Sequence, residues 1–346
     1  MSTRQALAAA SLAAVAAITP LGAQGGWTEH ALVLEVDGLR IPAVVAQPAG
    51  GRAASAILLI PGSLFSDADG NFPVWGWRPH AYADLARQLA ARGHVVLRYA
   101  KAGPGTGTEV LDAERARAHQ HFAERVAVAR HALGVLRAEP AARGAPVYLA
   151  GHSEGAVVAS LAAAEEPDVA GVVSLSGPSA GLLSIMREQL PDSADPAAFE
   201  AGAQAIRRGE PVPAEARQSP GMVALASMDP ATLRYIREVD AVDPAAATGR
   251  VRAPMLLVQG GRDASVREHH VRALARTRGS LPTEIALFPE LQHFYKRVDA
   301  GMDPAAAMQI STESDPAVAA AIDRWIRSER RRSRSHGAPP SSKKPG

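Results

Sequence analysis

The sequence predicts an α/β fold in which a mostly parallel β-sheet of about eight strands is covered by helices on both faces. Short, wholly apolar runs at residues 56–60, 147–150 and 255–259 have the length and composition of buried strands. Longer segments with helically spaced apolar residues, such as 112–137, lie between such runs. Apolar strands that alternate with helices are typical of a parallel sheet buried on both sides.

The expected elements follow one another along the chain in a regular order. Residues 30–36 and 39–46 flank Asp37-Gly38, a dipeptide that favours a tight hairpin turn, so we expect an antiparallel edge pair there. The remaining expected elements are a strand at 56–60, a helix at 81–91, a strand at 95–99, a helix at 112–137, a strand at 147–150, a helix from Glu154, strands at 169–175 and 255–259, a helix at 268–276, a strand at 284–288 and a helix at 318–326.

Residues 177–250 interrupt this alternation. They contain many Pro, Ala and charged residues, short helical patterns at 198–207 and 231–239, and no convincing strand. Because the segment is inserted between two sheet strands, we expect a helical cap over one end of the sheet. The main domain is expected to span residues 24–327, with this cap inside it.

The composition is that of a soluble protein with a sizeable core, since 47% of the 346 residues are hydrophobic and 21% are charged. The formal net charge is +2, and basic residues gather in the last segment, 328–346. We expect this tail to be disordered and to aid solubility, with binding of nucleic acid or anionic lipid as the alternative. No aromatic residues interleave its charges, so bases would have no stacking platform and no nucleic-acid partner is expected.

The first residues, 1–23, have the pattern of a secretory signal peptide. One Arg precedes a small and apolar run at 6–18, and Pro20 to Ala23 form a small-residue cleavage site, with cleavage expected near Ala23. We therefore expect export to the periplasm or the medium, with an uncleaved amphipathic helix as the alternative. The run is too short to span a bilayer stably, so no stable membrane anchor is expected. The chain has no cysteine, which excludes disulfides and Cys-based zinc sites.

The strongest functional signal is the sequence G-H-S-E-G at residues 151–155, between a predicted strand and a predicted helix. A sharp strand-to-helix turn that exposes a nucleophilic serine needs small residues two positions before and after it, and Gly151 and Gly155 supply them. The turn also sets the N–H of Glu154 at a helix N-terminus, where it can stabilise an oxyanion. Ser153 is therefore the candidate nucleophile.

A serine hydroxyl needs a base, and the base needs an acid to orient it. Where this turn is used, the acid and then the histidine follow the serine along the chain. Asp263 comes just after the strand at 255–259, and His293 lies in the loop after the last strand. The alternatives are a helix N-cap for Asp263 and a structural loop position for His293. A second oxyanion donor is expected from the backbone N–H of Ser63 or Leu64, after the strand at 56–60.

Taken together, these residues resemble the α/β-hydrolase superfamily, and more narrowly the bacterial esterases and serine aminopeptidase-like hydrolases with a G-H-S-E-G turn. The resemblance covers about residues 27–327, and its landmarks in order are 60–63, 69–71, 98–99, 151–155 and 260–263. It implies an α/β-hydrolase fold and cofactor-free carboxylesterase activity on short or medium acyl esters. Leu64 stands where a Gly is common, and residues 98–103 read R-Y-A-K-A-G in place of R-Y-D-K-R-G, so the shape of the pocket is expected to differ.

The expected reaction is acyl transfer through an acyl-enzyme, with Ser153 as nucleophile, His293 as general base and Asp263 as the acid that orients it. A small-molecule ester or acyl compound is the expected substrate. A peptidase, amidase or thioesterase with the same triad is one alternative, and a non-catalytic binding protein on this scaffold is another. No metal site is expected, since His119 and His121 lie two apart on a predicted helix and point to nearly opposite faces. His269 and His270 are adjacent on another predicted helix and are expected to be exposed.

Overall fold

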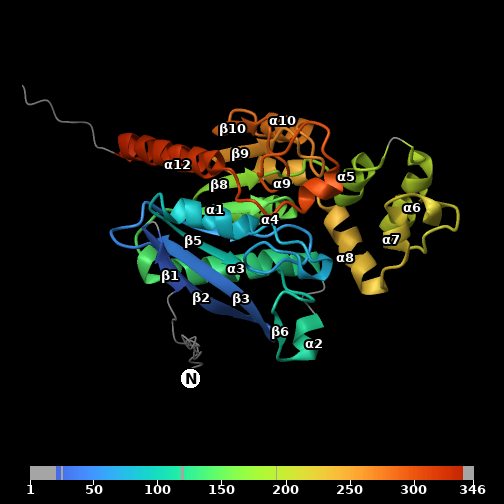
Figure 1. Cartoon of the computed structure of the whole chain (residues 1–346), viewed down its shortest axis with the longest axis horizontal. Helices are drawn as coiled ribbons and strands as arrows, with labels where there is room; N and C mark the ends of the chain where they lie inside the picture. Colours follow the sequence, from blue (N-terminus) through green and yellow to red (C-terminus); the bar gives the residue numbers. More distant parts are fainter. Residues whose placement is uncertain (1–20, 25, 118–120, 192, 338–346) are drawn as a thin grey trace, which may run out of the picture.

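One mixed β-sheet forms the centre of the molecule. The computed structural model describes residues 21–24, 26–117, 121–191 and 193–337. In these residues the sheet has ten strands in the order β1-β2-β3-β5-β4-β7-β8-β9-β10, with β6 paired to β3 (Figure 1). The strands are β1 (Leu21–Gln24), β2 (Trp27–Val36), β3 (Leu39–Pro48), β4 (Ser55–Ile60), β5 (His94–Tyr99), β6 (Glu109–Val110), β7 (Val147–His152), β8 (Val169–Leu175), β9 (Met255–Gly260) and β10 (Thr283–Phe288).

The pairing of the strands confirms the predicted mixed sheet. β2 and β3 are antiparallel, with Val36 opposite Leu39 around the Asp37-Gly38 turn, where both residues have positive φ angles of 40° and 83°. β3 also pairs antiparallel with β5, and from β5 to β10 all neighbouring strands are parallel. Because β1 and β6 have only four and two residues, the eight longer strands match the expected number.

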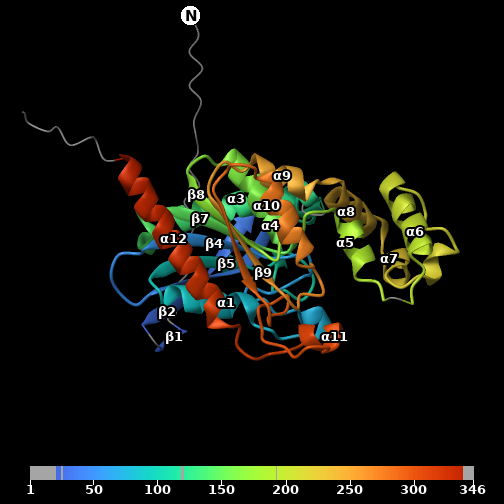
Figure 2. The ribbon, with the colours of Figure 1, turned by 90° about the horizontal axis from the view of Figure 1, so that it is seen from above.

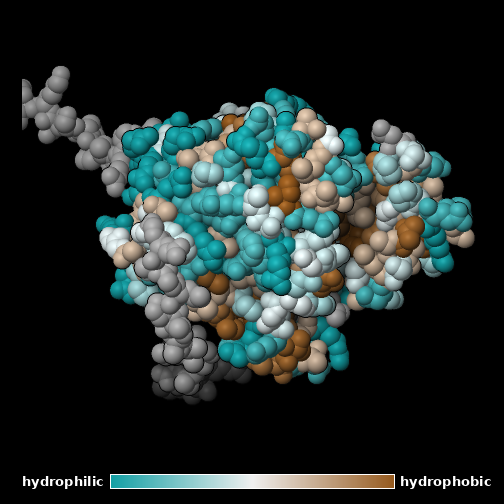
Figure 3. All heavy atoms as spheres, viewed as in Figure 1, coloured by the Kyte–Doolittle hydropathy of each residue, from teal (hydrophilic) through white to brown (hydrophobic). Residues whose placement is uncertain are grey.

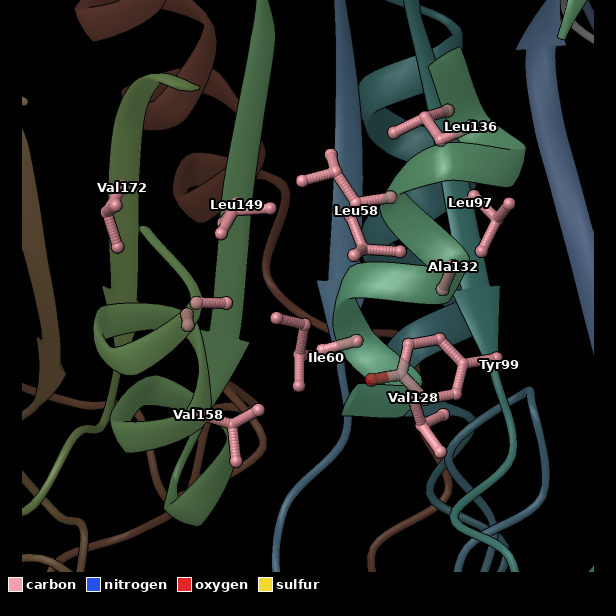
Figure 4. Close-up of a cluster of buried hydrophobic side chains, with 14 of the residues drawn as sticks. Leu58, Ile60, Leu97, Tyr99, Val128, Ala132, Leu136, Leu149, Val158 and Val172 are labelled. Atoms are coloured by element: carbon pink, nitrogen blue, oxygen red, sulfur yellow. The ribbon is translucent and has the colours of Figure 1, made fainter. Parts of the chain in front are cut away.

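Helices cover both faces of the sheet (Figures 1 and 2). Alternate side chains of β4 point to opposite faces: Leu58 and Ile60 join one apolar cluster and Ile57 joins the other. The first cluster includes residues of α3 (Phe122–Ala138), α4 (Glu154–Glu165) and α10 (His269–Thr277), and part of it is shown in Figure 4. The second includes residues of α1 (Ala81–Ala90) and α12 (Pro316–Gly337). The short helix α2 (Ala113–Ala116) precedes α3.

We call residues 177–250 the helical segment. Its described residues, between β8 and β9, hold α5 (Leu182–Glu188), α6 (Pro196–Arg208), α7 (Met222–Ala226), α8 (Pro230–Ala241) and α9 (Pro244–Arg250). A separate apolar cluster within it contains Phe199, Met222 and Leu225. Figure 1 shows α5 to α8 beyond the strand ends at one side of the sheet.

Asp-Pro dipeptides determine where several of the helices begin. The helices α6, α8, α9 and α11 (Pro304–Met308) each start at a proline whose preceding aspartate accepts a hydrogen bond from a backbone N–H of the first turn. Aspartate is a favoured N-cap residue, and proline at the first helical position loses no intrahelical hydrogen bond. The local sequence therefore defines the starts of these helices even where no strand pattern is present.

The two ends of the described chain adjoin the predicted signal peptide and the predicted tail. Residues 1–20 of the predicted signal peptide lie outside the described residues, and Leu21–Gln24 form β1, which pairs with β2. Cleavage after Ala23 would remove most of that strand. At the other end, α12 continues through Gly337 and so includes the first part of the tail that was expected to be disordered. The helix is supported there by Glu329, which is buried and accepts a hydrogen bond from Arg332 one turn later. Residues 338–346 lie outside the described part.

In the described ranges, every helix is too short or too polar to span a lipid bilayer.

Candidate active site

Ser153 occupies a strained turn between β7 and α4. Its φ and ψ angles are 55° and −123°, a combination that non-glycine residues rarely adopt. A Cβ atom on Gly151 would lie 2.0 Å from the carbonyl oxygen of Gly155, and one on Gly155 would lie 2.4 Å from the carbonyl oxygen of Ile60. The two glycines are therefore required for the turn to close, as the sequence pattern predicts.

Asp263 and His293 meet although they are 30 positions apart. The His293 Nδ1–H donates to Asp263 Oδ2 at 2.8 Å, and both residues are 5% exposed. The other carboxylate oxygen of Asp263 accepts from the backbone N–H groups of Ser265 and Val266 at 2.9 and 2.8 Å. Burial raises the pKa of Asp263, but the charge and hydrogen bond of His293 outweigh it and leave this pKa below its usual range. The acid is therefore held ionised against the imidazole.

Ser153 and His293 line the same cavity. Within the described residues, no hydrogen bond joins the Ser153 hydroxyl to the His293 ring. With Nδ1 donating to Asp263, the Nε2 atom of His293 keeps the lone pair that a base needs. In hydrolytic enzymes the contact between nucleophile and base commonly tightens only when substrate binds.

A hydrogen-bond chain links the loop after β4 to the loop that carries His293. The Gly62 N–H donates to Tyr82 Oη at 2.9 Å, and Tyr82 Oη lies 3.2 Å from His152 Nδ1. His152 Nε2 lies 3.0 Å from the His293 carbonyl oxygen, so it carries the proton and Tyr82 donates to Nδ1. Burial, followed by the nearby His293, lowers the pKa of His152 to about 3, which keeps its ring neutral.

Two buried cations hold the carbonyl groups of the loop after β4. Arg125 Nη2 donates to the carbonyl oxygens of Pro61 and Gly62 at 2.6 and 3.3 Å, and Lys101 Nζ donates to that of Ser63. In a trans peptide the C=O and the next N–H point in opposite directions, so the N–H groups of Ser63 and Leu64 point away from these cations.

The same loop lies directly beside Ser153. A Cβ on Gly62 would be 3.4 Å from Ser153 Cβ, and Ser63 and Leu64 both line the cavity. The Glu154 N–H occupies the first position of α4 and has no intrahelical acceptor. All three predicted donors thus lie near Ser153.

The Glu154 side chain is buried at the start of α4 and contacts two basic groups. It is 4% exposed, and its Oε1 lies 3.2 Å from Lys101 Nζ, 3.5 Å from Arg125 Nε and 2.9 Å from Tyr235 Oη. Burial raises the pKa of Glu154, but the charges of Lys101 and Arg125 lower it further, with a net fall. Burial lowers the pKa of Lys101 to about 7 against the attraction of Glu154.

Sequence reasoning missed Lys101, Arg125 and Tyr235 as members of this site. They come from the loop after β5, from α3 and from α8, and they meet around Glu154. The one available signal was Lys101 in the R-Y-A-K-A-G run, directly after a buried strand.

The cavity beside Ser153 has a volume of about 1110 Å³ and a mostly apolar wall. Trp75 and Trp77 both line it. The helical segment contributes a further wall, with apolar residues that include Leu182, Ile185, Met186, Leu225, Met228, Ile236 and Val239. On the face shown in Figure 3, hydrophobic residues gather near the junction of the sheet body and the helical segment.

Comparisons with known proteins agree with this architecture. The family model described as serine aminopeptidase, S33, matches residues 76–194. Esterase EstD of Thermotoga maritima is 27% identical over 294 residues, covering 85% of this chain and 66% of that protein, so the chain spans just under two thirds of its relative's length.

Solved esterases share the fold. Est1E from Butyrivibrio proteoclasticus superposes with a TM-score of 0.54 at 14% identity, covering 87% of this chain and 99% of that one. An esterase from Pyrococcus furiosus gives a TM-score of 0.53 at 11% identity, covering 91% of each chain. The expected α/β-hydrolase fold is confirmed, and the chain resembles the esterases of that superfamily.

Proposed function

We propose that this α/β hydrolase is a serine hydrolase that cleaves carboxylic esters through an acyl-enzyme. The observation that carries the proposal is the shared cavity, into which the strained turn presents Ser153 and the Asp263-paired His293 presents its ring. His293 Nε2 takes the Ser153 proton as the oxygen attacks the carbonyl carbon, and then protonates the leaving alcohol. Water, deprotonated by the same imidazole, attacks the acyl carbon and releases the acid.

Backbone groups supply the oxyanion stabilisation in this proposal. The tetrahedral intermediate places its negative oxygen between the Glu154 N–H and the N–H of Ser63 or Leu64. Lys101 and Arg125 support it indirectly, because they hold the carbonyls that fix the orientation of those N–H groups. The Asp263 carboxylate holds the imidazole tautomer and offsets the charge that His293 gains.

The lining of the cavity indicates the kind of ester. Its walls are largely apolar and aromatic, and its volume of about 1110 Å³ is larger than a short acyl group needs. Small-molecule esters with a sizeable apolar acyl or alcohol group fit such a wall. The helical segment acts as a cap in this proposal, since its helices supply part of that wall.

An amide or peptide substrate is the second candidate, and the match to the serine aminopeptidase model favours it. The same triad serves esters, thioesters and amides, so the cavity and not the triad selects the leaving group. A panel of p-nitrophenyl esters of graded chain length, measured beside aminoacyl anilides, separates these activities by their kcat/KM values.

Replacement of the nucleophile tests the reaction itself. Ser153→Ala is expected to lower kcat by several orders of magnitude with an unchanged fold, and to abolish labelling by a fluorophosphonate probe. Ser63→Ala is the matched control: it keeps the backbone N–H and should keep activity within a few-fold. Undiminished turnover by Ser153→Ala would refute the mechanism, and absence of probe labelling and of turnover in the unmodified protein would favour a binding protein on this scaffold.

Export is a separate proposal that rests on residues 1–23 alone. The apolar run and the small residues before Ala23 are the features that a signal peptidase reads. N-terminal sequencing of the protein recovered from the periplasm or medium tests it, and also decides whether β1 is present in the mature chain.

A further inference from the structure

A cluster of metal-ligating side chains lies outside the active site, where α5 meets α10. Glu188 is the last residue of α5, and His269 and His270 are the first two residues of α10. Glu188 Oε1 lies 3.4 Å from His269 Nε2, and Glu188 Oε2 lies 3.0 Å from His270 Nε2. Across the described ranges this is the one group of three such residues whose ligand atoms all lie within 4.8 Å of one another.

These separations suit a single transition-metal ion. Zinc binds imidazole nitrogen and carboxylate oxygen at about 2.0–2.2 Å, so two ligands of a tetrahedral ion are about 3.3 Å apart. The two Glu188 distances lie on either side of that value. The two imidazole rings are 4.0 Å apart between centroids and both direct Nε2 at the same carboxylate. Three protein ligands leave the fourth position for water.

The buried member of the cluster is oriented by a neighbour of its own. His270 is 1% exposed, which corrects the expectation that both histidines are exposed, and it contacts Glu188 of α5 and Ser179. Its Nδ1 lies 2.8 Å from Ser179 Oγ and accepts from the Ser179 N–H at 3.2 Å. If Nε2 binds a metal, the ring proton moves to Nδ1 and Ser179 Oγ accepts it, while the Ser179 N–H gives up its hydrogen bond to that nitrogen.

We propose that Glu188, His269 and His270 form a Zn²⁺ site that joins the helical segment to the sheet body. The nearby contacts already dock the end of α5 there: Arg267 Nη2 donates to the Glu188 carbonyl oxygen at 2.6 Å, and Gln189 Nε2 donates to that of Ser265 at 2.8 Å. A bound ion adds a link between α5 and α10. Because Ile185 and Met186 of α5 line the cavity, the ion would fix one wall of the proposed substrate pocket.

Metal binding by the full chain tests this site without reference to catalysis. After treatment with EDTA and its removal, titration calorimetry with Zn²⁺ should give one ion per chain with a micromolar or lower dissociation constant. Co²⁺ in the same site should give the visible absorption of a tetrahedral complex. Saturating Zn²⁺ should raise the melting temperature by a few degrees, since the ion binds the folded chain alone.

Three variants test whether Zn²⁺ binds at this cluster and not at other histidines of the chain. His269→Ala and Glu188→Gln should each weaken Zn²⁺ binding at least tenfold and remove the rise in melting temperature; both side chains are partly exposed, so the fold should persist. His121→Ala is the control, because His121 pairs with Glu238 at 2.7 Å outside this cluster, and it should bind like the unmodified protein. No binding, or binding that survives both His269→Ala and Glu188→Gln, would overturn the proposal.

Discussion

The side chains around Ser153 divide into those that take part in the proposed chemistry and those that hold loops in place. Tyr82 belongs to the second group: its hydroxyl accepts from the Gly62 N–H and donates to His152, whose other nitrogen donates to the His293 carbonyl. Burial raises the pKa of Tyr82 to about 12, so the hydroxyl keeps its proton at any working pH. One phenol thus connects the proposed oxyanion loop to the loop of the base.

Removing that hydroxyl should damage catalysis more than substrate binding. Tyr82→Phe leaves a buried N–H and a buried imidazole nitrogen without partners, so the free energy of unfolding should fall by about 1–3 kcal/mol. Small displacements of both loops should lower kcat about tenfold with little change in KM. Tyr99→Phe is the control, since it removes another buried tyrosine hydroxyl that takes no part in this chain. Equal kcat values for the two variants would contradict a positioning role.

Lys101 gives the stability of the fold a defined pH dependence. Burial lowers the pKa of its ammonium to about 7, from 10.5 in the unfolded chain. Between these values the unfolded chain holds a proton that the folded chain lacks, so raising the pH through this window should stabilise the fold. In Lys101→Met this contribution disappears. The difference in unfolding free energy between the protein and the variant should therefore rise from pH 7 to pH 10 in denaturant titrations, and a constant difference would contradict the lowered pKa of Lys101.

At the scale of elements, the turn from β7 to α4 depends on close backbone contact. A Cβ on Gly155 would lie 2.4 and 2.6 Å from the carbonyl oxygens of Ile60 and Pro61, neither of which can move freely. Gly155→Ala should destabilise the fold by about 2–3 kcal/mol in denaturant unfolding and reduce activity with it. Gly134→Ala is the opposite case: in the exposed middle of α3 its Cβ meets nothing within 4 Å, and it should stabilise by about 0.5–1 kcal/mol. Equal effects of the two changes would argue against steric closure of the turn.

The elements that sequence predicts well are those with a local signal. The apolar run at 56–60 and the Asp37-Gly38 turn locate β4 and the β2–β3 hairpin, although the hairpin is longer because pairing extends into its polar ends. Asp263 and His293 are predictable because both follow strands whose ends share one edge of the sheet.

The buried cluster around Glu154 has no local signal other than the position of Lys101 directly after a buried strand. Lys101, Arg125 and Tyr235 come from elements far apart in the sequence. Taken singly, each polar side chain would be expected at a solvent-exposed position. Their meeting depends on how α3 and α8 pack, and the spacing of apolar residues along the sequence does not encode this packing.

At the scale of the whole molecule, the cavity is enclosed by the sheet body and the helical segment, which differ in how much apolar packing stabilises each. The sheet is packed on both faces by extensive apolar clusters, whereas the helical segment has a smaller cluster of its own. Polar contacts join the two, among them the Tyr235 to Glu154 hydrogen bond and the bonds from His121 Nδ1 and the Phe122 N–H to Glu238, at 2.7 and 2.9 Å. We therefore expect access to the cavity to change through movement of the segment, with the sheet left intact.

This difference predicts that the helical segment opens before the sheet unfolds. The helices α6 and α7 pack on each other and on their neighbours in the segment, so their opening exposes less apolar surface than separation of β4 from β7. In native-state hydrogen exchange read by mass spectrometry, amides of α6 and α7 should exchange at least about tenfold faster than those of β4 and β7, equivalent to about 1.4 kcal/mol. Tyr235→Phe should widen that gap, because it removes a link from α8 to Glu154. If α6 and β4 exchange at the same rate under all conditions, the molecule unfolds as one unit and the segment cannot open independently.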